Sequence, residues 1–220
     1  RNRLDVGFDW FNRTTTRMLT KGKTLPAVLG ATEPKQNAAD LSTKGWEFSV
    51  KWNDRSTLFG KPFSYNFGVV LSDSRSFITK FDNPNKFLGD YYEGMELGEI
   101  WGYKTLGFFQ TDDEYKTHVD QRLVQSLAYS LNGHPMAGDI KFENRNGDDK
   151  ISNGKNTVDD PGDMYKIGND RPRYAYGVSA GANWNGISLD VFFQGIGKRD
   201  FWPEAESGVF WGFYNRWNQP

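Results

Sequence analysis

The chain has 220 residues, with 27 basic and 28 acidic side chains and a formal net charge of -1 at pH 7. This balance provides no global field that would recruit nucleic acid, so nucleic-acid binding is not expected. The absence of cysteine excludes disulfides, thiolate–zinc sites and cysteine nucleophiles. Aromatic residues nonetheless make up 16 % of the chain, which is a large apolar load for a polar sequence to bury in an ordinary core.

In chain order, five segments alternate apolar and polar residues with the period of two that is typical of a strand with one apolar face. In the second segment, for example, Phe48 and Val50 fall on the face opposite Glu47. The sequence therefore predicts an all-β fold of about five antiparallel strands. The segments are residues 3–11, 45–52, 64–72, 173–184 and 187–195.

The turns between these segments indicate how the strands are arranged. Asn185-Gly186 is a strong hairpin signal, because both central residues of a type I′ turn need a positive φ. If this turn marks one end of the sheet, the connection of intermediate length, residues 53–63, falls at the same end. The long connections, residues 12–43 and 82–172, then fall at the other end. Short turns at one end and long loops at the other are typical of an outer-membrane β-barrel, whereas soluble sandwiches show no such bias.

Five aromatic residues are expected near strand ends on the apolar face, where an interfacial aromatic girdle would place them. No apolar run approaches the roughly 18 residues of a membrane-spanning helix, but alternating strands can cross a bilayer at low mean hydropathy. The apolar face is therefore predicted to contact lipid. The five aromatic residues are Trp10, Trp46, Trp52, Tyr174 and Trp184.

The long connection of residues 82–172 contains a helix signal. Thr111 and Glu114 have the spacing of a capping box, and apolar residues follow at helical spacing. These features predict a short amphipathic helix on the loop assembly, with His118 facing solvent. The apolar residues are Tyr115, Val119, Leu123 and Leu127.

Residues 144–152, "NRNGDDKIS", are similar to a calcium-binding loop in which oxygen ligands occupy positions 1, 3, 5 and 7. Asn144, Asn146, Asp148 and the backbone carbonyl of Lys150 would fill these positions. A bound Ca²⁺ in residues 144–155 is one interpretation of the pattern. The other is an Asx-rich turn that is stabilised by its own side chains.

Three departures weaken the calcium pattern. Position 1 is a neutral Asn, Asp149 replaces the usual glycine, and Lys155 stands where a bidentate acid belongs. A later acid would then have to close the site, and the candidates are Asp159, Asp160 and Asp163.

No enzyme is expected, because the sequence contains no nucleophile elbow, phosphate-binding loop or metal-binding helix motif. The adjacent pair Asp159-Asp160 suggests glycoside hydrolysis only weakly, and solvated loop charges are the simpler interpretation. An aromatic cluster near the end of the chain either stacks on sugar rings or packs against neighbouring loops. Its members are Trp202, Trp211, Tyr214 and Trp217.

The stretch "GDIKFENRNGDDKIS", together with "IGNDRPRYAYGVSAGANWNGISLDVFFQGIGKRDFW", closely resembles the C-terminal barrel region of SusC/RagA-type TonB-dependent outer-membrane transporters. The segments "RLDVGFDWFNRTT", "KGWEFSVKW" and "LGEIWGYKTLGFFQTDDEY" resemble the same region in the same order. The resemblance covers nearly the whole chain and is most specific over residues 168–202. It is weakest in the calcium-like loop, where the family typically has Asp and Gly at the positions of Asn144 and Asp149.

The resemblance implies a 22-stranded transmembrane barrel, of which residues 1–220 are a part without the plug, the TonB-contacting segment or the final strands. Residues 82–172 would be a large extracellular loop. The whole protein would lie in the outer membrane of a Gram-negative bacterium. It would import glycans, oligosaccharides or peptides, with energy from the TonB complex and with a SusD-like surface lipoprotein as partner. The lumen would be lined by the polar strand face, including Arg3, Asp5, Glu47, Lys51, Arg173 and Asp190.

A second class of function is a soluble carbohydrate-binding β-sandwich, in which exposed Trp and Tyr side chains would stack directly on sugars. The two hypotheses differ in what covers the apolar strand face. In the transporter this face meets lipid, and in the sandwich it meets a second sheet.

Overall fold

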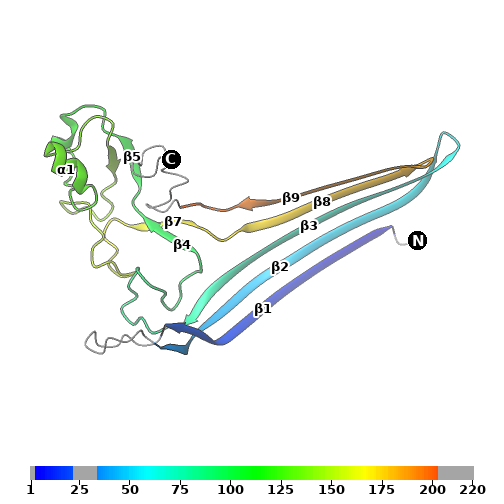
Figure 1. The fold of residues 1–220 in the computed structure, drawn as a ribbon, viewed down its shortest axis with the longest axis horizontal. Coiled ribbons are helices and arrows are strands. Elements are labelled where there is room, and N and C mark those ends of the chain that lie inside the picture. Colours follow the sequence, from blue (N-terminus) through cyan, green and yellow to red (C-terminus); the bar gives the residue numbers. More distant parts are fainter. Residues whose placement is uncertain (1–2, 22–33, 203–220) are drawn as a thin grey trace, which may run out of the picture.

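The computed structural model describes residues 3–21 and 34–202. A long, single-layered sheet extends from a smaller loop assembly, as Figure 1 shows. The strands are β1 (Leu4–Lys21), β2 (Lys35–Leu58), β3 (Lys61–Lys80), β4 (Glu99–Gly102), β5 (Thr105–Phe108), β6 (Ile140–Phe142), β7 (Tyr165–Asn169), β8 (Arg173–Trp184) and β9 (Ile187–Lys198). The helical segments are the 3₁₀ turn η2 (Glu114–Thr117) and the helix α1 (Ser126–Asn132).

Within the described residues, β1, β2, β3, β8 and β9 form one antiparallel sheet in that order. All five predicted strands are confirmed, but several are longer than the sequence indicated. The first two pair as far as Lys21 opposite Lys35, so much of the predicted connection 12–43 is strand. The apolar alternation of β1 stops near Trp10. Beyond this residue, toward Lys21 on β1 and Lys35 on β2, both faces carry mainly polar residues. Threonines 14–16 still favour extended backbone there.

The two tight turns lie at the same end of the sheet, as predicted (Figure 1). Asn185 and Gly186 join β8 to β9 with φ values of 48° and 87°. Phe59 and Gly60 join β2 to β3 with φ values of 50° and 72°. The prediction of a connection of intermediate length at residues 53–63 was wrong, because β2 and β3 stay paired up to this two-residue turn.

The strand register aligns the apolar residues of all five strands in rows across one face of the sheet. Alternate residues of a strand point to the same face, so the residues two positions further along each strand form the next row on that face. One central row consists of Val6, Val50, Val69, Val178 and Phe193.

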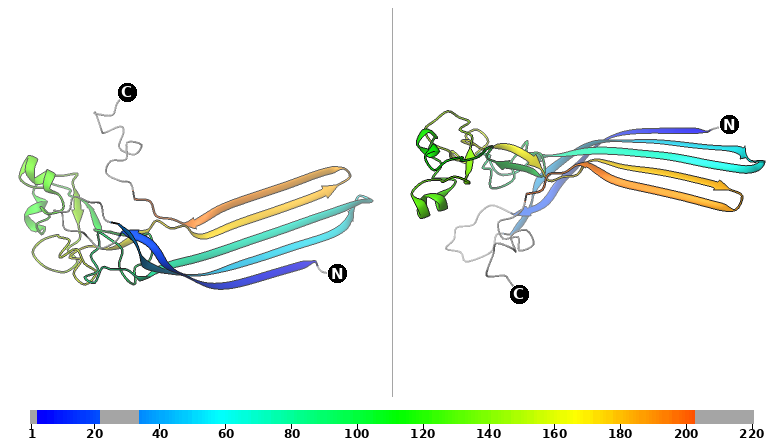
Figure 2. Two further views of the ribbon diagram at one scale, coloured as in Figure 1. Left: turned by 60° about the horizontal axis from the view of Figure 1, so that its bottom comes forward. Right: turned by 90° about the horizontal axis from the view of Figure 1, so that it is seen from above.

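The fully buried side chains do not lie under this apolar face. The buried hydrophobic residues are Tyr92, Phe109 and Ile151 of the loop assembly and Ile78 near the end of β3. In the sheet, Phe8 is 65 % exposed. Figure 2 shows the five strands as a single layer, and no second sheet packs on it among the described residues. This arrangement does not fit the predicted alternative of a β-sandwich.

The loop assembly is attached directly to the end of β3. The pairing of β3 with β8 ends at Ser72. Beyond this point the returning loop continues the ladder, since the amide of Ile78 donates to the carbonyl of Met95 at 2.9 Å and that of Leu97 donates to Ser76 at 2.8 Å. Two small ladders, β4 with β7 and β5 with β6, build the rest of the assembly. None of the described helices is long and apolar enough to cross a membrane.

The short helix predicted in this connection is confirmed as α1, but its predicted position was wrong, because only the 3₁₀ turn η2 forms directly after Thr111. The Glu114 carboxylate accepts the amide of Gln110 at 2.7 Å. Further on, the carbonyl of Asp120 accepts the amide of Ile151 at 2.7 Å, and Gln121 is fully buried. The pairing of Asp120 with Ile151 and the hydrogen bonds of Gln121 to Ile140 and Phe142 hold this segment in a non-helical path, so tertiary contacts override the helical spacing.

Candidate functional site

The largest chemical feature of the chain is the apolar band, defined here as the rows of apolar side chains between the level of Trp46 and that of Ser56 on β2. These two residues are ten positions apart, which is about 33 Å along a strand. At the roughly 40° tilt of strands in membrane barrels this length spans about 25 Å, the height of an outer-membrane apolar belt. The band consists of Leu4, Val6, Phe8, Trp10, Trp46, Phe48, Val50, Trp52, Phe63, Tyr65, Phe67, Val69, Leu71, Tyr176, Val178, Ala180, Ala182, Trp184, Ile187, Leu189, Val191 and Phe193.

The large side chains of the band are exposed across the width of the sheet. Exposed fractions are 64 % for Trp10, 45 % for Phe67, 63 % for Leu189 and 66 % for Phe193. Exposed apolar surface of this extent marks an interaction face, because single soluble domains rarely leave such a patch uncovered.

Aromatic residues lie at both edges of the band. Trp10 and Trp46 are opposite each other at the edge near the loop assembly. At the turn edge, Trp184 Nε1 donates to the carbonyl of Leu58 at 3.0 Å, and the Trp184 ring meets that of Phe59 edge-on at 6.1 Å. The prediction that Trp10, Trp46 and Trp52 lie near strand ends was wrong, because β1 continues to Lys21 and β2 spans Lys35–Leu58. Trp52 lies inside the band, whereas Trp10 and Trp46 lie at its edge.

Of the turn-edge aromatics, Trp184 was predicted near a strand end, and Tyr65 falls in the predicted strand 64–72. Phe63, which stacks on Tyr65 at 5.5 Å, was missed as a strand residue. Its signal was present in the alternation of "KPFSYNF", but residues 53–63 were predicted to be a loop.

The opposite face of the sheet consists mainly of polar and small residues, although Val70 and Phe192 on this face are 47 % and 63 % exposed. Asp5 lies opposite Lys51, and Asp190 lies opposite Gly181. Glu47, also predicted on this face, lies opposite Asp9.

Two predicted polar-face residues are placed differently. Arg3 pairs with Asp54 at 3.1 Å and Arg173 with Asp73 at 2.5 Å. Asp54 and Asp73 follow the alternation of the apolar face: Asp73 lies at the level of Trp46, at the edge of the band, and Asp54 lies inside the band, one row from its turn edge. Both arginines lie at strand ends, and the backbone of Tyr174 is left-handed, with a φ of 56°, so regular alternation does not fix the direction of Arg173.

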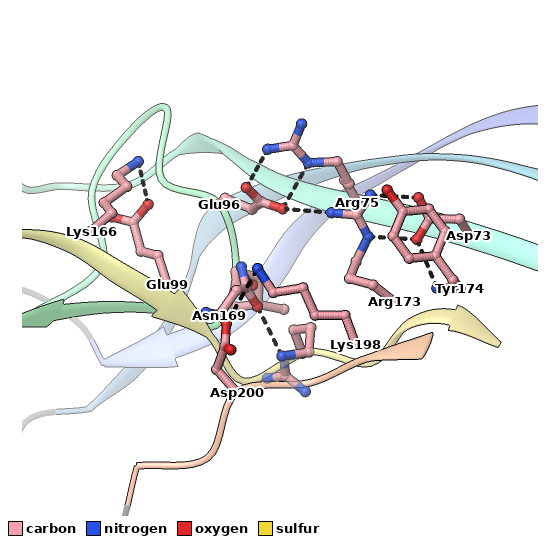
Figure 3. Close-up of polar contacts among 12 residues, drawn as sticks. Asp73, Arg75, Glu96, Glu99, Lys166, Asn169, Arg173, Tyr174, Lys198 and Asp200 are labelled. Atoms are coloured by element: carbon pink, nitrogen blue, oxygen red, sulfur yellow. Dashed lines mark hydrogen bonds and ion pairs between the residues drawn. The ribbon is translucent and has the colours of Figure 1, made fainter. Parts of the chain in front are cut away.

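Figure 3 shows the junction network, which consists of the ion pairs and hydrogen bonds that connect the ends of β3 and β8 with the loop assembly. The Arg173 guanidinium binds both oxygens of Asp73 at 2.5 Å, and the Asp73 side chain is 8 % exposed. The backbone N–H of Tyr174 donates to the same carboxylate at 3.4 Å. The Asp73 carboxylate therefore accepts a hydrogen bond from the irregular backbone at the start of β8 and also neutralises the charge of Arg173.

Arg75 continues the network into the loop. Its Nε donates to Glu96 Oε1 at 2.8 Å and its Nη2 to Glu96 Oε2, and Arg173 Nη1 lies 4.0 Å from the same Glu96. The Arg75 guanidinium holds the pKa of Glu96 below its usual range. Because Glu96 belongs to the returning loop, this carboxylate joins the loop to two strands (Figure 3).

A second carboxylate is buried deeper in the assembly. The Glu99 side chain is 2 % exposed and its Oε1 accepts the hydroxyl of Tyr92 and, at 2.9 Å, Nε1 of Trp101. Lys166 Nζ lies 2.6 Å from Oε2 and compensates the buried negative charge, although the geometry of this contact is not that of a hydrogen bond. Burial, assisted by the Glu99 carboxylate, raises the pKa of Tyr92 well above its usual range. Glu99 and Lys166 thus form an ion pair whose acidic partner is buried.

β7 is tied to the chain that follows β9. The amide of Asn169 donates to Asp200 Oδ2 at 2.8 Å, and the amide of Asp200 donates to the Asn169 carbonyl at 3.0 Å (Figure 3). With the pairs above, this link holds the loop assembly at the ends of three strands. Each carboxylate of this network binds a cation or a backbone N–H group. Such an arrangement holds the loop assembly in a fixed position relative to the strands.

The calcium-like loop folds as the Asx-rich turn that was the alternative interpretation. Asn144 Oδ1 accepts the amide of Gly147 at 2.8 Å, and Asn146 Oδ1 accepts that of Asp148 at 3.1 Å. Asp148 Oδ1 in turn accepts the amide of Lys150 at 2.9 Å, and this hydrogen bond lowers the pKa of Asp148. The side-chain oxygens of the three predicted ligands already serve backbone donors.

Asp163 closes the loop from the later segment. It is 1 % exposed and accepts the amides of Arg145 at 2.7 Å and Ser152 at 2.8 Å. Asp160 lies 3.9 Å from Lys155, and Asp159 is exposed. Among the described residues, no group of three or more His, Cys, Asp or Glu side chains could hold a metal ion. Calcium binding here, which would rely mainly on amide and carbonyl oxygens, stays a prediction.

Two further predictions concern single residues. His118 was expected to face solvent, which was wrong: its Nε2 is buried without a hydrogen-bond partner and its ring meets Phe109 edge-on at 5.5 Å. Burial lowers the pKa of His118. Of the terminal aromatic cluster, Trp202 is 57 % exposed, whereas Trp211, Tyr214 and Trp217 lie outside the described residues.

Comparison with known proteins gives relatives of one kind. No protein-family model matches the chain. TonB-dependent receptor P39 of Formosa agariphila is 30 % identical over 88 % of the chain, and TonB-dependent receptor P3 of the same organism is 23 % identical over 88 %. The chain spans about a fifth of the length of these relatives, namely 20 % and 18 %.

Solved structures agree in fold. The structure of the RagAB peptide transporter matches with a TM-score of 0.55 and 21 % identity, covering 88 % of this chain and 19 % of that one. A RagAB peptide importer in the "open-open" state matches with a TM-score of 0.55 and 20 % identity, covering 89 % of this chain and 19 % of that one. These likenesses identify the chain as a part of a TonB-dependent receptor, whose sheet corresponds in fold to a part of the antiparallel β-barrel of the RagAB transporter.

Proposed function

We propose that the chain forms part of the wall of an outer-membrane importer in a Gram-negative bacterium. The observation that carries this proposal is the apolar band, whose height of about 25 Å fits the belt of an outer-membrane barrel. In this role the band faces lipid and the opposite, polar face lines the lumen. Residues 82–172 then form an extracellular loop, held over the strand ends by the junction network.

The proposed transport is energised by the TonB complex and assisted by a SusD-like surface lipoprotein. The cargo is a glycan, an oligosaccharide or a peptide, and the name of the RagAB peptide transporter supports the peptide among these. No catalytic step belongs to the proposal. In the junction network the carboxylates are bound to arginine, lysine or backbone donors, so their task is to hold the loop assembly in place.

The proposal is tested by an arginine in the central row of the apolar band. Val178→Arg in the full-length protein places a charge against lipid near the middle of the bilayer, which costs about 2 to 4 kcal/mol. We expect a clear loss of protein assembled in the outer membrane, measured by membrane fractionation and by heat-modifiable migration of the folded barrel.

The matched control is Ser179→Arg, the same change one residue further along β8 on the polar face. This variant should assemble at nearly the normal level, because its charge reaches water in the lumen. Equal assembly of both variants would show that lipid does not contact the band, and the importer proposal would fail.

A further inference from the structure

A pocket of about 580 Å³ opens beside the β4–β7 ladder, next to the Glu99 carboxylate, whose partners Trp101 and Lys166 line it. Two aromatic rings and two cations line it, namely Trp101, Tyr165, Arg145 and Lys166. No aspartate or glutamate occurs among the described residues of its lining. The pocket therefore presents positive charge next to apolar surface.

Arg145 is held in place without an acidic partner. Its guanidinium carbon lies 5.0 Å above the ring of Tyr165, and its Nη1 donates to the carbonyl of Met164 at 3.3 Å. No carboxylate among the described residues forms an ion pair with it. A guanidinium carries five N–H donors, so most of them stay available to an incoming acceptor, and little side-chain entropy remains to be lost.

Lys166 supplies a second, weaker positive charge. Its Nζ lies 5.8 Å above the ring of Trp101 and 2.6 Å from Glu99, so part of its charge is already compensated. Its side chain is 50 % exposed and lines the pocket while it stays paired with Glu99. An anion bound by Arg145 would therefore meet a second cation on the same wall.

The rest of the lining is mostly apolar. Val158, Pro161 and Met164 are half-buried and contribute carbon and sulfur surface. The neutral polar side chain here, Asn146, already donates from Nδ2 to Asp148 at 2.8 Å. A sugar ring would bring several hydroxyl groups that need partners, and unpaired polar groups are costly when buried. An apolar group next to a carboxylate fits this lining better.

We propose that this pocket binds the carboxyl end of a peptide whose last side chain is apolar. The carboxylate pairs with the guanidinium of Arg145 in a bidentate manner, and Lys166 assists. The apolar side chain packs against Val158, Pro161 and Met164. This inference rests on the proposed import function and narrows its cargo to peptides with a free carboxyl end.

The test uses the full-length protein, purified from outer membranes in detergent, and isothermal calorimetry. The probes are a short alanine peptide ending in leucine, with a free carboxyl group or with a carboxamide. We expect the free acid to bind at least about tenfold more tightly, and Arg145→Gln to abolish this preference. The matched control is Arg122→Gln, because Arg122 also lies above a tyrosine ring, 5.1 Å from that of Tyr129, but outside the pocket.

Several results would overturn the inference. One is an equal affinity for acid and carboxamide, and another is a preference that survives in Arg145→Gln. Arg145-dependent binding of oligogalacturonate without binding of the peptide would assign the pocket to acidic sugars and would also refute it. TonB-dependent uptake of other cargo by the Arg145→Gln protein would leave the importer function standing, so failure of the pocket and failure of the function are told apart.

Discussion

At the scale of single residues, the contacts of Glu96 connect the loop assembly to the strands. Its carboxylate binds Arg75 and lies near Arg173, and its pKa is lowered mainly by the hydrogen bonds from Arg75. A carboxylate whose pKa is lower in the folded state stabilises that state fully at pH values above its unfolded pKa. The stabilisation is lost as the pH falls through the lower, folded pKa.

We therefore predict that acid loosens the attachment of the loop. As the pH is lowered through and below 4.5, the ordinary value for glutamate, amides that pair β3 with the returning loop should lose protection. Ile78 and Leu97 report this pairing, and hydrogen exchange corrected for the intrinsic rate measures it. In Glu96→Gln the protection should be lower at neutral pH and should change less in acid. An unchanged acid response in this variant would contradict the role given to Glu96.

At the scale of elements, the Asn185-Gly186 turn fixes how β8 pairs with β9. An added Cβ at Gly186 would meet nothing within 4 Å, yet the φ of this residue is 87°. A substitution there acts through backbone conformation alone, without a clash.

Gly186→Val is predicted to destabilise the protein by about 1 to 2 kcal/mol, because a β-branched residue is strained in left-handed backbone. Gly186→Asn is the control, since asparagine adopts this conformation more readily and should cost less. The free energy of unfolding, from denaturant titration of the full-length protein in detergent, measures both. Equal losses for the two variants would mean that the conformation of the turn does not limit stability.

At the scale of the whole molecule, the described sheet leaves its apolar face and both edge strands uncovered. The edges are β1 and β9, and the band carries side chains such as Phe193 that are more than half exposed. Uncovered edges and apolar faces associate with other chains unless lipid, detergent or further strands cover them.

The 220-residue chain by itself is therefore predicted to associate in plain buffer and to disperse when detergent is added. Light scattering over a detergent titration measures this. Replacing Phe8, Val50, Val178 and Leu189 by serine should reduce the association, because these residues share the band across four strands. A monodisperse monomer of the unchanged chain without detergent would contradict the lipid-facing role of the band.

The sequence by itself determined the five strands, the polarity of the sheet and the face that is apolar. These properties follow from local alternation and from one turn signal, Asn185-Gly186, both of which depend on neighbouring residues alone. It also indicated the Asx-rich turn at Asn144, since short polar side chains hydrogen-bond to nearby backbone.

Only the tertiary structure decided how far the strands extend, that no continuous helix follows Thr111 and where Arg173 points. Each of these depends on partners distant in sequence: Lys35 for the end of β1, Ile151 for the non-helical path around Asp120 and Asp73 for the arginine. The pocket around Arg145 has the same origin, because it gathers residues from β4 to β7 that no local pattern brings together. Local periodicity reports what each segment prefers, whereas long-range pairing selects which preferences are kept.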